Sequence, residues 1–112
     1  RLHSDGCVVE VLDQLVKTGV TILNIQDVVN GLENIARECK GKVCVDLDID
    51  RQRLMPYGTP QDVKEHIRRS VKLLSSRKGG LMFIVGLYPP TPLENIKALC
   101  EVFEEVMWLN DY

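Results

Sequence analysis

Short apolar runs alternate with amphipathic helical patterns along the whole chain of 112 residues. A strand ends within the opening "RLHSDG", and strand-like runs return at 20–25, 42–49 and 81–85, each followed by apolar residues spaced by three and four. Four strand–helix repeats are typical of parallel βα units, arranged as an open doubly wound sheet or as part of a barrel. Neither a G-x-G-x-x-G motif nor a P-loop follows any run, which disfavours the nucleotide-binding open sheet.

Polar residues mark where the helices are expected to begin. Asp5 is predicted to cap a helix over 7–17, and Asn30, with an acidic residue three positions later, to cap the second helix. Thr59 and Thr91 are each followed by Pro, which tolerates the first helical position because it needs no hydrogen-bond acceptor there. The sequence therefore predicts four helices, one after each strand.

The charge balance disfavours two classes of partner. With 14 basic and 16 acidic side chains the net charge is −2, whereas nucleic acid and anionic membranes require a clustered basic field. The longest apolar run, "LMFIVGLY", is far shorter than the roughly 20 residues of a membrane helix. Without interleaved aromatic residues, the basic residues of the third helix predict a solvated face. They are Lys64, Arg68, Arg69 and Lys72.

The four cysteines include no C-x-x-C pair. In a chain long enough to bury a core, scattered cysteines favour buried thiols over a disulfide framework. This usage predicts a reducing, cytoplasmic location.

Carboxylates are concentrated at the end of the third strand-like run. Side chains alternate across a strand, so Asp46, Asp48 and Asp50 share one face while aliphatic residues occupy the other. In a barrel the aliphatic face would meet the helices and the Asp face would line the mouth, which predicts a catalytic role for all three. The alternative is that Asp50 caps a turn and that the other two pair with Arg51 or Arg53.

Other polar residues also stand at the ends of the predicted strands. His3 and Asp5 share a parity, and an imidazole beside a carboxylate can ligate zinc or transfer protons. The alternative is that His3 bonds a neighbouring loop while Asp5 caps a helix. Substrate-binding residues are expected at the same edge of the sheet. They are Asn24, Gln26, Arg53 and Tyr88.

Four blocks, "HSDG", "GVTILNIQ", "DIDRQRLMPYGTPQDV" and "GLMFIVGLYPPTPLENIKAL", resemble the uroporphyrinogen decarboxylase superfamily in order and spacing. This superfamily includes corrinoid- and coenzyme M-linked methyltransferases. The resemblance implies an α/β fold, the C-terminal half of a (β/α)8 TIM barrel, with four βα units and parallel strands. Residues 1–112 would then form one half-barrel domain whose first strand is truncated.

The chain departs from the superfamily pattern at three places. Methyltransferase members bind zinc through H-x-C, whereas here His3 is followed by Asp5, a harder ligand that holds zinc more weakly. Val85 stands where those members have a second Cys and decarboxylases have a His. Leu47 and Asp48 replace a Gly-Gly pair. The expected state is therefore without a cofactor, with zinc at His3 and Asp5 as the alternative.

Three hypotheses follow from the resemblance. The parent protein is a decarboxylase of a tetrapyrrole or related polyacid, or a metal-dependent methyltransferase of the same superfamily. In the third hypothesis the chain is a non-catalytic half-barrel that self-associates, because a lone half-barrel leaves two open sheet edges and an apolar inner face. The expected partners are a small-molecule substrate of the parent and further copies of the chain.

Overall fold

The computed structural model describes residues 1–108, so the last four residues of the predicted 1–112 unit lie outside the described part. Its four strands pair in parallel in the order β1-β2-β3-β4. The strands are β1 (Leu2–Ser4), β2 (Ile22–Gln26), β3 (Cys44–Asp48) and β4 (Leu81–Ile84). The helices are η1 (Val9–Val11), α1 (Leu12–Val16), α2 (Asp27–Asn30), α3 (Leu32–Cys39), α4 (Leu54–Tyr57), α5 (Pro60–Leu74) and α6 (Leu93–Met107).

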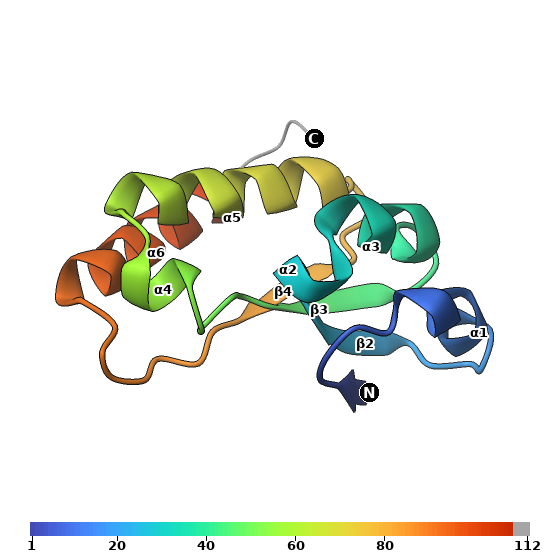
Figure 1. Ribbon diagram of the computed structural model, residues 1–112. Coiled ribbons are helices and arrows are strands. Elements are labelled where there is room, and N and C mark those ends of the chain that lie inside the picture. Colours follow the sequence, from blue (N-terminus) through green and yellow to red (C-terminus); the bar gives the residue numbers. More distant parts are fainter. Residues whose placement is uncertain (109–112) are drawn as a thin grey trace.

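The strand order distinguishes the two architectures that the sequence left open. Each strand pairs with the next one along the chain, without the reversal of order that defines a doubly wound sheet. Crossovers of one hand that always step in one direction place their helices on one side of the sheet. Figure 1 shows α3, α5 and α6 together on one side of the strands. The prediction of four parallel βα units, as in part of a TIM barrel, is confirmed.

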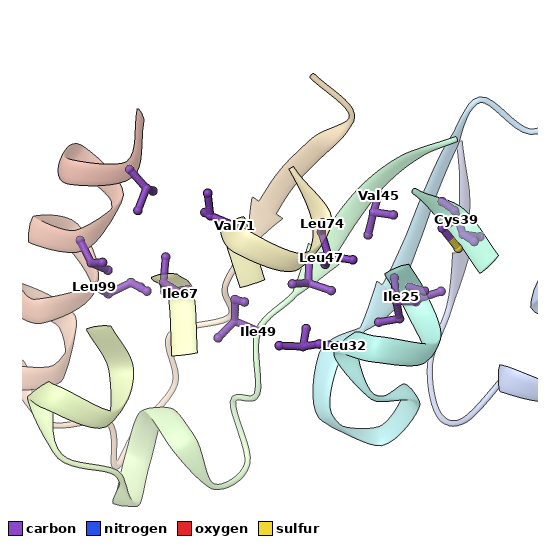
Figure 2. Close-up of a cluster of buried hydrophobic side chains, with 14 of the residues drawn as sticks. Ile25, Leu32, Cys39, Val45, Leu47, Ile49, Ile67, Val71, Leu74 and Leu99 are labelled. Carbon is purple, nitrogen blue, oxygen red and sulfur yellow. The ribbon is translucent and has the colours of Figure 1, made fainter. Parts of the chain in front are cut away.

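The core lies between this helix layer and the helix-facing side of the sheet. Leu23, Val45 and Leu47 point from the strands toward the helices and are at most 1% exposed. Ile67 on α5 and Leu99 on α6 meet them from the other side (Figure 2). The apolar periodicities of strand and helix thus converge on one buried cluster.

Three of the four predicted caps, those at Asp5, Asn30 and Thr91, are wrong. The side chain of Asn30 accepts a hydrogen bond from Val8 N (2.8 Å), so the amide turns toward the first loop and away from α3; neither Asn30 nor Asp5 caps a helix. The hydroxyl of Thr91 donates to the carbonyl of Tyr88, and α6 has no side-chain cap. The predicted cap at Thr59 is confirmed.

The basic face of α5 is used within the protein. Lys64 pairs with Glu101 at 2.6 Å, Arg68 binds Glu105 with two hydrogen bonds of 2.9 Å, and Arg69 pairs with Glu33. These ion pairs join α5 to α6 and α3, so the patch is a helix-pairing surface and not only a solvated one. Within residues 1–108, no helix is long and apolar enough to cross a membrane.

Candidate functional site

Toward the carboxyl ends of β1, β2 and β3, the side of the sheet that faces away from the helices is polar, whereas on β4 it is apolar. The strand register sets His3 beside Asn24, Asn24 beside Asp46, and Asp46 beside Met82. A second row, toward the carboxyl ends of the strands, contains Gln26, Asp48 and Ile84. The register therefore brings together His3, Asn24, Asp46, Gln26 and Asp48, five residues that the sequence predicted as parts of a site.

Asn24 fixes the orientation of the His3 ring. Its Nδ2 donates to the carbonyl of Asp46 at 2.8 Å, which leaves Oδ1 directed at His3 Nδ1, 2.5 Å away. Because Oδ1 can only accept, His3 Nδ1 carries the hydrogen and Nε2 is the ring atom that can gain or lose a proton. Nε2 lies 3.3 Å from Asp5 Oδ1. His3 thus has the hydrogen-bonding pattern of a proton-transfer group.

Asp46 is paired rather than free. Arg1 reaches it with Nη2 at 2.8 Å and Nε at 3.2 Å, and the Asp46 side chain is 8% exposed. Asp46 therefore pairs with an arginine, as the alternative interpretation of the carboxylate cluster proposed, but the partner is Arg1 and not Arg51 or Arg53.

Asp48 lies in a cleft of about 190 Å³ at the carboxyl ends of β2 and β3. The walls come from residues 26–29 and from residues 48–53, the loop that follows β3. Burial raises the pKa of the Asp48 carboxyl, the Arg51 guanidinium lowers it, Asp27 and Asp5 raise it further, and His3 lowers it. Asp48 is thus the predicted site carboxylate whose ionised form is disfavoured by its surroundings.

Asp50 and Gln26 shape the loops around the cleft. The Asp50 carboxylate accepts the backbone N–H groups of residues 52, 53 and 54 at 3.0, 3.2 and 3.3 Å. Gln26 Oε1 accepts from Gly6 N at 2.8 Å and holds the loop after β1. Asp50 therefore folds a turn, as its alternative interpretation proposed, and that turn presents Arg53 at the cleft.

Arg51 joins the loops that follow β3 and β4. Its Nη1 is 3.9 Å from Asp48 Oδ2, and its guanidinium lies over the Tyr88 ring, 5.9 Å from the ring centroid. Gly86 leaves room for the Tyr88 ring in this position, since a Cβ there would lie 2.6 Å from a ring carbon. Tyr88 therefore lies beside the predicted site because it contacts Arg51, which the sequence analysis named only as an ion-pair partner.

His3 and Asp5 do not form a complete zinc site. Structural and catalytic zinc sites have at least three protein ligands, and residues 1–108 contain no group of three or more His, Cys, Asp or Glu side chains able to hold a metal. The pair could contribute two ligands to a centre completed from elsewhere.

Asp27 and His66 were not identified from the sequence. The His66 Nε2 to Asp27 Oδ2 distance is 2.5 Å, and the two side chains are 15% and 1% exposed. His66 lies on α5, 39 residues away in the chain. Asp27 directly follows a polar strand end, a signal for a site residue, but no local pattern links it to a histidine on a distant helix.

The comparisons with known proteins agree with the fold. Residues 1–106 match the family model described as uroporphyrinogen decarboxylase (URO-D). A protein named uroporphyrinogen decarboxylase from Prochlorococcus marinus is 31% identical over 96 residues, which cover 86% of this chain and 26% of that protein. The chain thus spans about a quarter of the length of this curated relative. No solved structure matches.

Proposed function

Because the chain belongs to the uroporphyrinogen decarboxylase family, we propose that it is the C-terminal half-barrel of a decarboxylase acting on a tetrapyrrole or a related polycarboxylate. The observation that carries this proposal is the cleft at the carboxyl ends of β2 and β3, where Arg51 and Arg53 stand beside the buried Asp48. Active sites of TIM barrels form at this end of the strands.

The cleft has the chemistry to bind one carboxylate arm of a substrate. Guanidinium groups bind carboxylates through paired hydrogen bonds, and Arg51 and Arg53 both line the walls. A volume of about 190 Å³ is small beside the roughly 300 Å³ and more of typical ligand pockets. We therefore assign the cleft to one arm, with the macrocycle over the polar inner face of the sheet.

Asp48 and His3 have complementary roles in this proposal. Protonation of a pyrrole ring carbon gives a cation, and loss of CO₂ from the acetate arm moves the electron pair of the broken C–C bond into the ring. The arm carbon then takes up a proton as the ring carbon releases its own, so that one proton replaces one CO₂. The ionised Asp48 carboxylate stabilises such a cation better than Asp50, whose oxygens already accept three backbone N–H groups. His3 Nε2 faces the same side and transfers protons, while Asn24 holds the ring.

The test is an anaerobic assay of the complete protein with uroporphyrinogen, following the formation of coproporphyrinogen. Asp48→Asn should lower kcat by about 100-fold or more, the scale of a lost electrostatic contact in a transition state. Arg53→Ala should mainly raise KM, because it removes a substrate contact. Lys97→Ala, on the exposed side of α6, is the matched control. No coproporphyrinogen from the wild-type protein would contradict the uroporphyrinogen version of the proposal.

The contact between His3 and Asp5 favours a second candidate, a metal-dependent methyltransferase. The two side chains approach within 3.3 Å and are 48% and 64% exposed, so a metal could reach them. The remaining ligands would come from outside residues 1–108. Metal analysis of the complete protein decides between the candidates: stoichiometric zinc that is lost in His3→Ala supports the methyltransferase, and zinc-free protein contradicts it.

We also propose that the isolated chain self-associates and that the protein works in the cytoplasm. Within the described residues β1 and β4 each pair on one side only, and Met82 and Ile84 on the inner face are 40% and 43% exposed. Unpaired strand edges and exposed apolar side chains promote association between copies. Sedimentation of residues 1–112 tests this, and a monodisperse monomer would contradict it.

A further inference from the structure

The buried pair of Asp27 and His66 connects the helix layer to the edge of the cleft. Asp27 is the first residue of α2, directly after β2, and it lines the cleft. Its carboxylate accepts from Val28 N at 2.6 Å and from Asp50 N at 3.2 Å. Its Oδ2 also faces His66 Nε2 from α5. An ionised carboxylate can only accept hydrogen bonds, so we assign His66 Nε2 as the donor to Asp27 Oδ2. One carboxylate therefore joins three segments of the chain.

The connection continues from Asp27 to the turn that carries the arginines. Asp27 holds the backbone N–H of Asp50, and the Asp50 carboxylate accepts the N–H groups of residues 52–54. This turn places Arg51 and Arg53 on the wall of the cleft. His66 reaches neither arginine directly, so any effect it has on them passes through Asp27 and Asp50.

We infer that His66 is a positioning residue that holds the arginine-bearing turn, residues 50–54, in the conformation that binds substrate. Without His66, Asp27 keeps a buried negative charge and loses its side-chain donor, which is costly because buried charges require partners. The carboxylate would then turn toward water in the cleft and release Asp50 N. The functional meaning of this inference rests on the proposed substrate-binding role of the cleft.

The experiment compares three variants of the complete protein. His66→Leu removes the donor. His66→Gln places an amide N–H near the position of the imidazole Nε2. Ile67→Val is the matched control, because it loosens the same helix without touching Asp27. His66→Asn, whose amide is too short to reach Asp27, replaces the Leu variant if the latter does not fold.

The first measurement is backbone amide hydrogen exchange in the turn. His66→Leu should speed exchange at residues 52–54 by about tenfold or more, the scale of one charge-assisted hydrogen bond, while His66→Gln remains close to wild type. Unchanged protection of these amides, or an equal loss in Ile67→Val, would overturn the inference.

The second measurement separates this inference from the proposed function. If the wild-type protein decarboxylates uroporphyrinogen, His66→Leu should raise KM by about tenfold while kcat stays within about twofold, since the turn binds substrate. A normal KM beside fast exchange would overturn the positioning role. If uroporphyrinogen is not a substrate, the proposed function fails, and the exchange comparison alone decides whether His66 holds the turn.

Discussion

The two sides of the sheet come from the same strands and carry opposite chemistry. Toward the helices, Leu23, Val45 and Leu47 are fully buried among other apolar side chains. On the opposite side, the alternate residues Asn24 and Asp46 are also nearly inaccessible, yet they are polar. Asn24 donates to the backbone carbonyl of Asp46, and the Asp46 carboxylate accepts from Arg1. Burial of apolar groups stabilises a fold, whereas burial of carboxylates costs stability. The comparison teaches that one side maintains the structure and the other is available for chemistry.

Parts of the sequence blocks that carry the family resemblance build the fold. Asn95 of "PLENI" donates from Nδ2 to the carbonyls of Met55 and Gly58 at 2.9 and 2.8 Å, and these bonds join it to the segment "MPYGTP". Thr59 and Asp62 form a reciprocal capping box at the start of α5. A Cβ at Gly58 would lie 2.6 Å from the carbonyl oxygen of Leu54. These segments therefore contribute to the resemblance by building the fold, whereas Asp48, Arg51 and Arg53 at the start of the same block line the cleft.

The largest expected difference is in the stability lost when a residue on either side of the sheet is replaced by alanine. Leu47→Ala should destabilise the protein by about 2–5 kcal/mol, because it opens a cavity in the core. Ile84→Ala on the adjacent strand should cost less than about 1 kcal/mol, because that side chain is already 43% exposed. Urea unfolding followed by circular dichroism measures both. Equal losses would mean that the inner face is as densely covered as the helix face, and the comparison would fail.

The sequence predicts the structural side better than the site. The apolar residues around Leu47 and Ile67 recur with the periods of a strand and of a helix. The strands, the helices and their parallel order could therefore be predicted from the sequence. Asp46, Asp48 and His3 were placed on one face for the same reason. The pairing of Asp27 with His66 depends on how α5 lies over the sheet, and no periodicity encodes that distance.

A smaller contrast concerns the pH dependence of Asp48. Burial raises the pKa of the Asp48 carboxyl in the folded state. The group therefore makes its whole contribution to the free energy of unfolding below the ordinary Asp pKa, and this contribution is lost as the pH rises through the folded-state pKa. At neutral pH the ionised carboxylate therefore costs stability. Asp48→Asn should make the protein slightly more stable at neutral pH and give no gain well below pH 4, the ordinary Asp value being about 3.9.

Urea unfolding at the two pH values measures this effect, and the decarboxylase assay measures its functional counterpart. A more stable but inactive Asp48→Asn protein would sharpen the comparison, since it separates the residue's chemical use from its structural cost. A less stable variant at neutral pH would show instead that the ion pair with Arg51 outweighs burial.

The smallest expected difference is in the reactivity of the cysteine thiols on the two sides of the sheet, which can be measured without changing the protein. Burial raises the pKa of Cys39, on the helix side, to about 11, so at pH 8 only about one thiol in a thousand is the reactive thiolate. Cys44, on the inner face, is partly exposed, and burial and the neighbouring Asp46 raise its pKa. Iodoacetamide should therefore label the exposed Cys7 and Cys100 first, Cys44 next, and Cys39 only on unfolding. Peptide mapping by mass spectrometry gives the order, and early labelling of Cys39 would mean that the helix layer opens under native conditions.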